Sequence, residues 1–166
     1  MHIVTDEDRT YLRRAVELAA RAVAAGDQPF GSVLVSADGE VLFEDRNRTS
    51  GGDSTRHPEF EIARWAAEHV AAEDRANCVV YTSGEHCSMC STAHALVGLG
   101  RIVYASSGEQ LRSWRRELGI GGTSPIAPLP INAVAPHIPV AGPDAELSQQ
   151  VRALYERWAR TVAKLI

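Results

Sequence analysis

A pair of cysteines separated by two residues, Cys87 and Cys90, constrains the possible folds of this chain more than any other feature. The chain has 166 residues and three cysteines. An odd count with one close pair argues against a framework of disulfides and favours metal or redox chemistry. Cys78 has no neighbour at such a spacing, and we predict that it is a small buried side chain within a strand. The fold has to present Cys87 and Cys90 together with the further groups that their chemistry requires.

A second motif, His57-Pro58-Glu59, supplies these further groups. Proline is favoured at the first position of a helix, and apolar residues follow Pro58 at helical spacing, so a helix is predicted to begin just after His57. Residues 88 to 97 are rich in small and apolar side chains and predict a buried helix that begins just after Cys87. The 27 residues between Glu59 and Cys87 contain a predicted strand, which allows the N-termini of the two helices to meet.

The two motifs together predict a catalytic zinc site. Imidazole and thiolate groups are good ligands for Zn²⁺, and we expect His57, Cys87 and Cys90 to bind it, which leaves a fourth position for water. Bound zinc lowers the pKa of such a water towards ~7 and so creates hydroxide at neutral pH. Glu59 is close enough to reach this water without being a ligand, and we predict that it is the catalytic proton shuttle. The alternatives for the cysteine pair are a redox centre and half of a structural zinc ribbon.

The segment that precedes these motifs predicts one helix followed by a hairpin. Thr5 and Asp8 have the spacing of a capping box, and apolar residues follow them at helical spacing. Asp38-Gly39 is a strong hairpin signal and lies between two segments of strand character, residues 32 to 36 and 41 to 46. We therefore expect two antiparallel strands directly after the first helix.

Strands and helices alternate in the second half of the chain. A short strand from 78 to 82 precedes the helix from 88 to 97, and another strand from 102 to 105 precedes a helical segment that ends at Gly119. Such alternation favours parallel strands joined by crossover helices. The fold class is therefore predicted to be α/β, with a mixed sheet whose antiparallel part is the hairpin.

Residues 121 to 166 are predicted to form a C-terminal extension. Residues 121 to 143 contain six prolines, Pro143 included, so this part should be a loop, with one edge strand near Asn132 to Ala135. Asp144 is the predicted N-cap of a final helix, and we expect the extension to cover the active site and tune specificity. The apolar face of the final helix comprises Leu147, Val151, Leu154, Tyr155, Trp158, Val162 and Leu165.

Composition limits the classes of function. Hydrophobic residues make up 45% and charged residues 23% of the sequence, as in an ordinary globular protein, and the length suits a single domain over residues 1 to 166. The net charge of -4 provides no overall attraction to nucleic acid. No apolar run is long enough to span a bilayer, and the acidic N-terminal stretch does not resemble a signal peptide. We therefore expect a cytoplasmic protein with no membrane partner.

Five sequence blocks occur in the order found in one known family, and they are Pro29-Phe30-Gly31-Ser32, Asn47, His57-Pro58-Glu59, Ser83-Gly84-Glu85-His86-Cys87-Ser88-Met89-Cys90 and Arg101-Ile102-Val103-Tyr104-Ala105. The resemblance covers roughly residues 8 to 120. The chain resembles the cytidine and deoxycytidylate deaminase superfamily, particularly the branch that contains bacterial guanine deaminases and tRNA adenosine deaminases. It departs from the family at His86, which replaces the usual proline, and at Pro58, which replaces a common alanine and has no backbone N–H to donate.

The resemblance implies a three-layer α/β/α fold of the cytidine deaminase type, with a central mixed sheet of about five strands flanked by helices. It implies the same zinc ligands and the same proton shuttle as above, with Asn47 binding the ring of the substrate and Phe30 helping to wall the pocket. It also implies a homodimer, which the apolar faces of the helix after the first cysteine and of the final helix favour. His86 either points into the pocket or fills the space that proline usually occupies. The further candidates for substrate binding are Gly31, Ser32, Glu85 and His86.

These observations predict a zinc-dependent hydrolytic deaminase that acts on a free nucleobase or related amino-heterocycle, such as guanine or cytosine, and releases ammonia. One alternative is a tRNA adenosine deaminase, for which Trp114 and the arginines around it could contact RNA, unless this segment is a solvated helix face. A second alternative is a zinc-bound protein that has lost catalysis, although an intact Glu59 argues against it. His94, four residues after Cys90, is predicted to serve packing or an interface, because a fourth protein ligand would close the water position.

Overall fold

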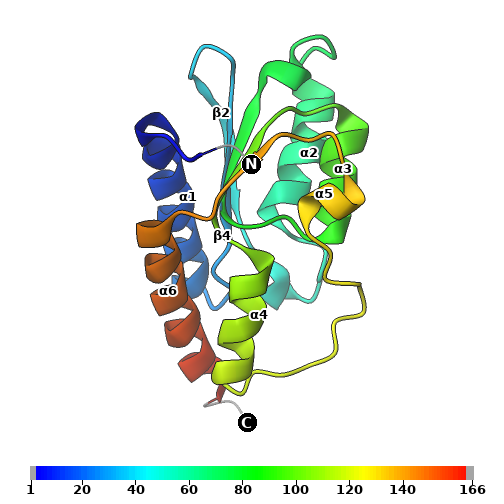
Figure 1. Cartoon of the computed structure of the whole chain (residues 1–166). Helices are drawn as coiled ribbons and strands as arrows, with labels where there is room; N and C mark the ends of the chain where they lie inside the picture. Colours follow the sequence, from blue (N-terminus) through cyan, green and yellow to red (C-terminus); the bar gives the residue numbers. More distant parts are fainter. Residues whose placement is uncertain (1–2, 164–166) are drawn as a thin grey trace.

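A mixed five-stranded sheet forms the centre of the fold (Figure 1). Its strands are β1 (Gly31–Val35), β2 (Val41–Arg46), β3 (Val79–Gly84), β4 (Ile102–Ser106) and β5 (Val140–Ala141). The computed structural model describes residues 3 to 163, and in it the strands lie in the order β2, β1, β3, β4, β5. β1 pairs antiparallel with β2 and β3, whereas β3 pairs with β4 and β4 with β5 in parallel. The predicted mixed sheet with an antiparallel hairpin is confirmed.

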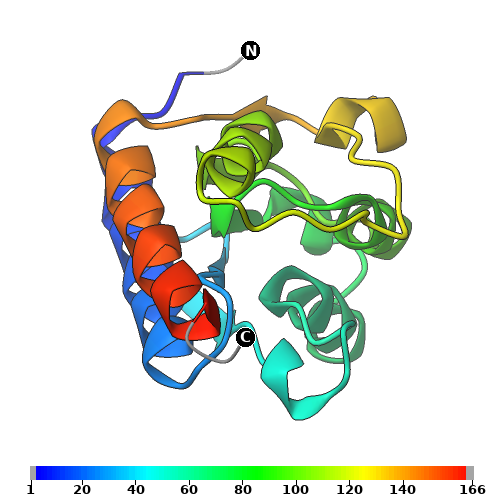
Figure 2. The same cartoon turned by 90° about the horizontal axis from the view of Figure 1, so that it is seen from below.

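Helices cover both faces of the sheet and form the predicted three layers (Figures 1 and 2). They are α1 (Asp6–Ala24), α2 (Pro58–His69), α3 (Ser88–Val97), α4 (Gly108–Glu117), α5 (Ile131–Val134) and α6 (Ala145–Ala163), with short 3-10 turns at Thr49–Gly51 and Arg75–Asn77. α1 and α6 lie side by side on one face, above Val33 and Tyr81, and α2 and α3 cover the other, above Leu34 and Val80. Among residues 3 to 163, no helix combines the length and hydropathy needed to cross a membrane.

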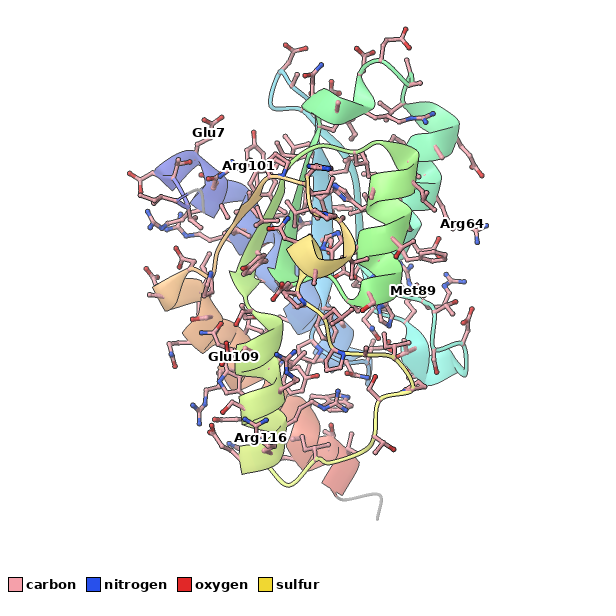
Figure 3. The ribbon with its side chains drawn as sticks, turned by 45° about the vertical axis from the view of Figure 1, so that its right-hand side comes forward. Glu7, Arg64, Met89, Arg101, Glu109 and Arg116 are labelled. Carbon is pink, nitrogen blue, oxygen red and sulfur yellow. The ribbon has the colours of Figure 1, made fainter. Side chains whose placement is uncertain are left out.

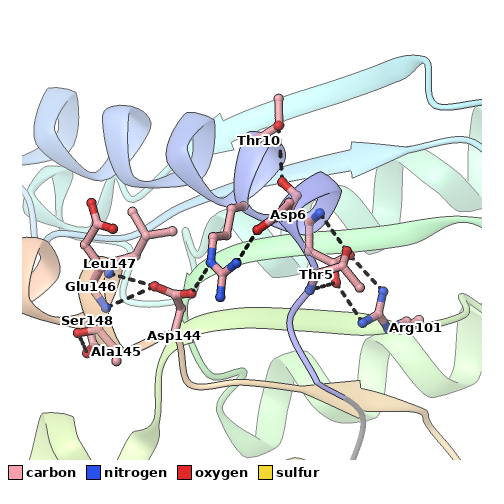
Figure 4. Close-up of polar contacts among 11 residues, drawn as sticks. Thr5, Asp6, Thr10, Arg101, Asp144, Ala145, Glu146, Leu147 and Ser148 are labelled. Carbon is pink, nitrogen blue, oxygen red and sulfur yellow. Dashed lines mark hydrogen bonds and ion pairs between the residues drawn. The ribbon is translucent and has the colours of Figure 1, made fainter.

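Local signals set the ends of the helices where the sequence predicts them. The backbone N–H of Thr5 donates to Asp8 Oδ2 at 2.9 Å, and that of Asp8 donates to Thr5 Oγ1 at 3.1 Å, which completes the capping box of α1 (Figure 4). Arg101 donates to both carboxylate oxygens of Asp8, at 2.8 and 3.0 Å, and so joins the start of α1 to the start of β4. α3 ends at Gly98, whose φ of 82° is readily adopted only by glycine.

Asp144 caps α6, as predicted (Figure 4). Its Oδ1 accepts hydrogen bonds from the backbone N–H groups of Glu146 at 3.1 Å and Leu147 at 2.9 Å, and its Oδ2 accepts one from Arg9 Nε at 2.8 Å. This ion pair holds the start of α6 against α1. The predicted apolar face of α6 packs into the core within the chain, so it does not support the expected homodimer. Leu165, which is predicted on the same face, lies outside the described residues.

The proline-rich segment differs from the prediction at one place. The prediction of an edge strand near Asn132 to Ala135 is wrong. The chain forms the single helical turn α5 there and joins the sheet only later, at β5. Pro130, with φ of -67°, suits the start of such a turn. Ile131 is buried against β4, and Asn132 Nδ2 donates to the carbonyl oxygens of Ala135 at 3.2 Å and Ile138 at 2.9 Å. These contacts close the turn and leave no extended edge.

Gly31, at the start of β1, lets α1 lie directly against the sheet. A Cβ atom there would come within 2.5 Å of Leu18 Cβ and 2.6 Å of Ala19 N, and still closer to the carbonyl oxygen of Ala15. Backbone atoms of a packed helix cannot move aside without displacing the helix. The close contact between α1 and β1 therefore requires glycine at this position.

We expect the Gly31→Ala variant to be less stable than the wild type by about 2–3 kcal/mol, because the added methyl group overpacks this contact. Urea denaturation followed by circular dichroism measures the difference. Gly121→Ala is the matched control, since a Cβ at Gly121 meets no atom within 4 Å. Its stability should stay within about 0.5 kcal/mol of the wild type. Equal stability of the two variants would contradict the packing described for Gly31.

Candidate metal centre

Two helix N-termini bring the predicted zinc ligands together. His57 directly precedes α2, Cys87 directly precedes α3, and Cys90 lies in the first turn of α3. His57 Nδ1 lies 3.7 Å from Cys87 Sγ and 3.6 Å from Cys90 Sγ, and the two sulfur atoms are 3.5 Å apart. Within residues 3 to 163, this trio is the group of three ligating side chains whose donor atoms are close enough to hold one metal ion.

The dimensions of the trio fit zinc. With Zn–S bonds of about 2.3 Å and a Zn–N bond of about 2.0 Å, tetrahedral angles place nitrogen and sulfur about 3.5 Å apart and two sulfurs about 3.8 Å apart. The observed distances between the three ligand atoms, 3.5 to 3.7 Å, agree with these values. Three protein ligands leave one tetrahedral position for water. The ligand types and their spacing therefore fit a catalytic zinc site better than a closed structural one.

The electrostatics of the trio favour a thiolate beside the imidazole. The hydrogen-bond contact between Cys87 and Cys90, supported by the contact between Cys87 and His57, lowers the pKa of Cys87 to about 4. The same contact raises the pKa of Cys90, and the hydrogen bond to Cys87 raises the pKa of His57. The N-terminus of α3 adds positive partial charge next to Cys87. The site therefore holds at least one anionic sulfur at neutral pH.

Glu59 lies in the first turn of α2 and is only 4% exposed. Its Oε2 is 3.9 Å from Cys90 Sγ, and its Oε1 accepts a hydrogen bond from Thr82 Oγ1 at 3.0 Å. Burial raises the pKa of Glu59 to about 7. A carboxyl group with such a pKa can both accept and donate protons near neutral pH. The structure thus places a proton-carrying group beside the trio.

Asn47 directly follows β2 and is 1% exposed. Its backbone N–H donates to the carbonyl oxygen of Phe30 at 2.9 Å. Its side-chain Oδ1 accepts hydrogen bonds from the backbone N–H of Thr49 at 3.1 Å and from the Thr49 hydroxyl at 2.8 Å. These contacts use the oxygen of the amide and leave Nδ2 as the group that can donate to a ligand.

The three residues of the motif Phe30-Gly31-Ser32 each have a different environment. Phe30 packs on Gly84, where a Cβ would come within 2.8 Å of the ring, and against Tyr155 of α6. Gly31 lies beneath α1. Ser32 is buried on the opposite face of the sheet, where its hydroxyl donates to a hydroxyl of β3 at 2.8 Å. Substrate contact by Gly31 and Ser32 stays a prediction, since the structure gives each of them a role within the fold.

Glu85 and His86 are likewise engaged within the chain. The Glu85 carboxylate accepts hydrogen bonds from the backbone N–H groups of Gly108 at 2.8 Å and Ile131 at 3.1 Å. His86 is 2% exposed and packs edge-on against His94, with ring centroids 5.4 Å apart. Among the described residues, neither ring nitrogen of His86 has a hydrogen-bond partner, and burial lowers its pKa well below the usual value. His86 therefore fills interior space, and its contact with substrate stays a prediction.

Two predictions of purely structural roles are confirmed. His94 is buried, and its Nε2 lies 2.7 Å from the carbonyl oxygen of Gly100, so it packs in the interior instead of joining the trio. Cys78 is a buried side chain, as predicted, with its Sγ 3.6 Å from the carbonyl oxygen of Asp74, but it lies immediately before β3 instead of within the strand.

The structure removes the aromatic part of the possible RNA-binding patch on α4. Trp114 is buried in the core that also contains Leu147 and Val151 of α6. Glu109 and Arg116 lie on the outer surface of α4 (Figure 3). The exposed part of this segment is therefore a solvated helix face of mixed charge.

Sequence reasoning missed one residue that contacts the site, Thr82. Its hydroxyl lies between Glu59 and Ser32. The only signal that could have revealed it is the pairing of two hydroxyl residues across β1 and β3, which depends on strand register.

Comparison with known proteins gives a family match over the region that carries the site. Residues 5 to 106 match the cytidine and deoxycytidylate deaminase zinc-binding region. A probable cytosine deaminase from Schizosaccharomyces pombe is 32% identical over 108 residues, which are 65% of this chain and 65% of the relative. The guanine deaminase of Bacillus subtilis is 42% identical over 83 residues, 49% of this chain and 53% of the relative. A tRNA-specific adenosine deaminase from Agrobacterium fabrum is 32% identical over 101 residues, 60% of this chain and 66% of the relative.

A solved structure of the guanine deaminase from Nitrosomonas europaea superposes with a TM-score of 0.71 over 96% of this chain and 87% of that one. At 18% identity this likeness shows a shared fold alone. The chain spans from about half to about two thirds of the length of these three curated relatives. The family match covers more than half of the chain and includes the whole trio. The chain therefore belongs to the cytidine and deoxycytidylate deaminase family, with His57, Cys87 and Cys90 as its zinc-binding cluster.

Proposed function

We propose that this protein is a zinc-dependent hydrolytic deaminase of a free nucleobase or related amino-heterocycle, such as guanine or cytosine. The observation that carries the proposal is the zinc-sized trio with the buried carboxyl group of Glu59 beside it. Two of the relatives are named as a probable cytosine deaminase and a guanine deaminase. The net charge of -4 and the burial of Trp114 favour a small substrate over RNA.

Glu59 performs the proton transfers in this proposal. Zinc bound by the trio supplies the Lewis acidity that makes a water molecule nucleophilic near neutral pH. Glu59 Oε2 accepts the proton that this water loses as it attacks the ring carbon that bears the amino group. Glu59 donates this proton to the ring nitrogen, then takes the second proton from the new hydroxyl group on the ring carbon and passes it to the amine as the C–N bond breaks. Water and substrate thereby give a carbonyl product and ammonia.

Asn47 and Phe30 hold the ring of the substrate in the same proposal. Thr49 fixes the orientation of the Asn47 amide, which directs Nδ2 towards an acceptor on the ring. Phe30 offers an aromatic surface for the ring to pack on. The further substrate-binding residues in the proposal are Gly31, Ser32, Glu85 and His86.

The C-terminal extension, residues 121 to 166, is proposed to belong to the same domain, to cover the active site and to tune specificity. The segment between α4 and α5 runs past α3 (Figure 2), where the carbonyl oxygen of Ala127 accepts a hydrogen bond from Ser88 Oγ at 2.8 Å. Ser88 directly follows the zinc-cluster residue Cys87. In α6, the ring of Tyr155 packs against that of Phe30, with centroids 6.2 Å apart. The extension therefore adjoins both the metal trio and the proposed pocket wall.

A homodimer formed through α3 is also proposed. Leu96 on this helix is 83% exposed. An exposed large apolar side chain on a helix that carries part of the site is consistent with an interface, and sedimentation velocity measures the oligomeric state.

An ammonia-release screen tests the proposed function. Guanine, cytosine, adenine and an aminotriazine are each offered to zinc-loaded protein, and at least one should release ammonia, whereas an adenosine-containing anticodon stem-loop should release none. Turnover of the stem-loop without turnover of any free base would instead assign the activity of the tRNA-specific relative. Stoichiometric zinc with no ammonia from any compound would show a protein that binds zinc without catalysis.

A further inference from the structure

A chain of two buried hydroxyl groups ends on the carboxylate of Glu59. Ser32 on β1 and Thr82 on β3 are partners in the antiparallel register, so their side chains emerge next to each other on the face of the sheet that carries α2. Ser32 Oγ lies 2.8 Å from Thr82 Oγ1, which lies 3.0 Å from Glu59 Oε1. Both hydroxyl residues are fully buried, so bulk water does not compete for these hydrogen bonds.

The number of available hydrogens sets the direction of this chain. Each hydroxyl group has one hydrogen to donate. Ser32 donates its hydrogen to Thr82, whose own hydrogen has three possible acceptors: Glu59 Oε1, and the carbonyl oxygens of Gly84 at 2.9 Å and Gly31 at 3.5 Å. An ionised carboxylate is a stronger acceptor than a neutral carbonyl. When Glu59 is ionised, the hydrogen bonds therefore run from Ser32 to Thr82 and from Thr82 to Glu59.

The contact with Thr82 determines which oxygen of Glu59 faces the metal trio. Because Thr82 holds Oε1 at the sheet, Oε2 is the carboxylate oxygen that lies 3.9 Å from Cys90 Sγ. A displacement of about 1 Å at a reacting group can lower a rate ~10²-fold. We propose that Thr82 is a positioning residue, itself oriented by Ser32, that fixes the carboxylate of Glu59 for proton transfer at Oε2. The inference rests on the proposed function of Glu59.

The Thr82→Val variant removes the hydroxyl and keeps the shape of the side chain. We expect kcat for ammonia release from guanine, or from cytosine if guanine is not turned over, to fall about 10- to 100-fold, with KM changed less than about 2-fold. Thr82→Ser keeps the donor and should stay within about 3-fold of the wild type, and Ser32→Ala should lose about 3- to 10-fold. Ser106→Ala is the control, since the buried Ser106 hydroxyl donates to the carbonyl oxygen of Ser83 at 2.7 Å instead of to Glu59. Its kcat should be unchanged.

A crystal structure of Thr82→Val provides a readout that does not depend on turnover. The carboxylate of Glu59 should leave its place 3.9 Å from Cys90 Sγ in Thr82→Val and keep it in Thr82→Ser. An unmoved Glu59 in Thr82→Val, or an equal loss of kcat in Ser106→Ala, would overturn the inference. If Thr82→Val does not fold, kcat and the crystal structure of Ser32→Ala test the inference instead. If the wild type deaminates no base, the proposed function fails, and the position of Glu59 in the variant structures still decides whether Thr82 orients it.

Discussion

The Glu59→Gln variant is expected to bind zinc as the wild type does and to lose nearly all turnover, with a fall of about 10²- to 10⁴-fold in kcat. Glutamine is close to glutamate in size, and the substitution leaves the three residues of the trio in place. An amide cannot accept and return a proton near neutral pH. Elemental analysis measures the zinc content, and ammonia release from the substrate found in the screen measures kcat.

Glu61→Gln is the matched control for this experiment. Glu61 also lies in the first turn of α2, but its carboxylate pairs with Arg56 Nε at 3.6 Å. A partly exposed ion pair of this kind contributes little, so kcat should change less than about 2-fold. Near-normal activity of Glu59→Gln would contradict its role in proton transfer. Loss of zinc in that variant would show that Glu59 supports the metal site instead.

Replacing Cys90 by serine should remove the metal itself. Cys90 is fully buried and belongs to the trio that binds zinc. Loss of a side chain that only hydrogen-bonds to a metal ligand typically lowers metal affinity ~10- to 100-fold. Cys90→Ser removes a ligand itself and leaves two, so zinc affinity should fall by more than this. Bound metal stabilises the folded state that binds it, so zinc should no longer raise the melting temperature of Cys90→Ser. Zinc titration calorimetry and thermal denaturation with and without zinc measure both effects.

Cys78→Ala tests whether the loss is specific to the trio. Cys78 is equally a buried cysteine, but it lies before β3 with its Sγ near the carbonyl oxygen of Asp74. Its substitution should lower the stability by about 1 kcal/mol and leave zinc affinity unchanged. Wild-type zinc affinity in Cys90→Ser, or loss of zinc in Cys78→Ala, would contradict the ligand set.

Most helix boundaries of this fold could be predicted because the signals that set them are local. Thr5 and Asp8 satisfy the first backbone N–H groups of α1, and Asp144 does the same for α6. Pro58 starts α2 and Gly98 ends α3 through their own backbone conformations. None of these effects depends on distant parts of the chain, so each could be recognised without a structure.

Contacts between distant segments account for what the sequence could not reveal about the fold. The short apolar run near Asn132 to Ala135 is compatible with a strand or a helical turn, and the burial of Ile131 against β4 favours the turn. Trp114 lies on a helix rich in arginine and could be exposed or buried. It is buried because α6 packs against it, and this contact joins segments that are far apart in the sequence.

The same distinction holds for the site. The zinc cluster could be predicted because the ligand types and their spacing define it, and because both motifs stand at the N-termini of helices. The contact of Thr82 with Glu59 could not, because it depends on the register that pairs Thr82 with Ser32. The substrate depends on two or three pocket contacts, and a single polar mismatch among them outweighs the shared scaffold.

The dependence of turnover on bound zinc tests the central claim most directly. Protein stripped of metal is reloaded with measured amounts of zinc, and ammonia release from the substrate found in the screen is recorded at each step. We predict no ammonia from metal-free protein and a linear rise in rate that ends at one zinc per chain. Full turnover without zinc, or no turnover of any compound in the screen at full zinc occupancy, would contradict the assignment of a zinc-dependent deaminase.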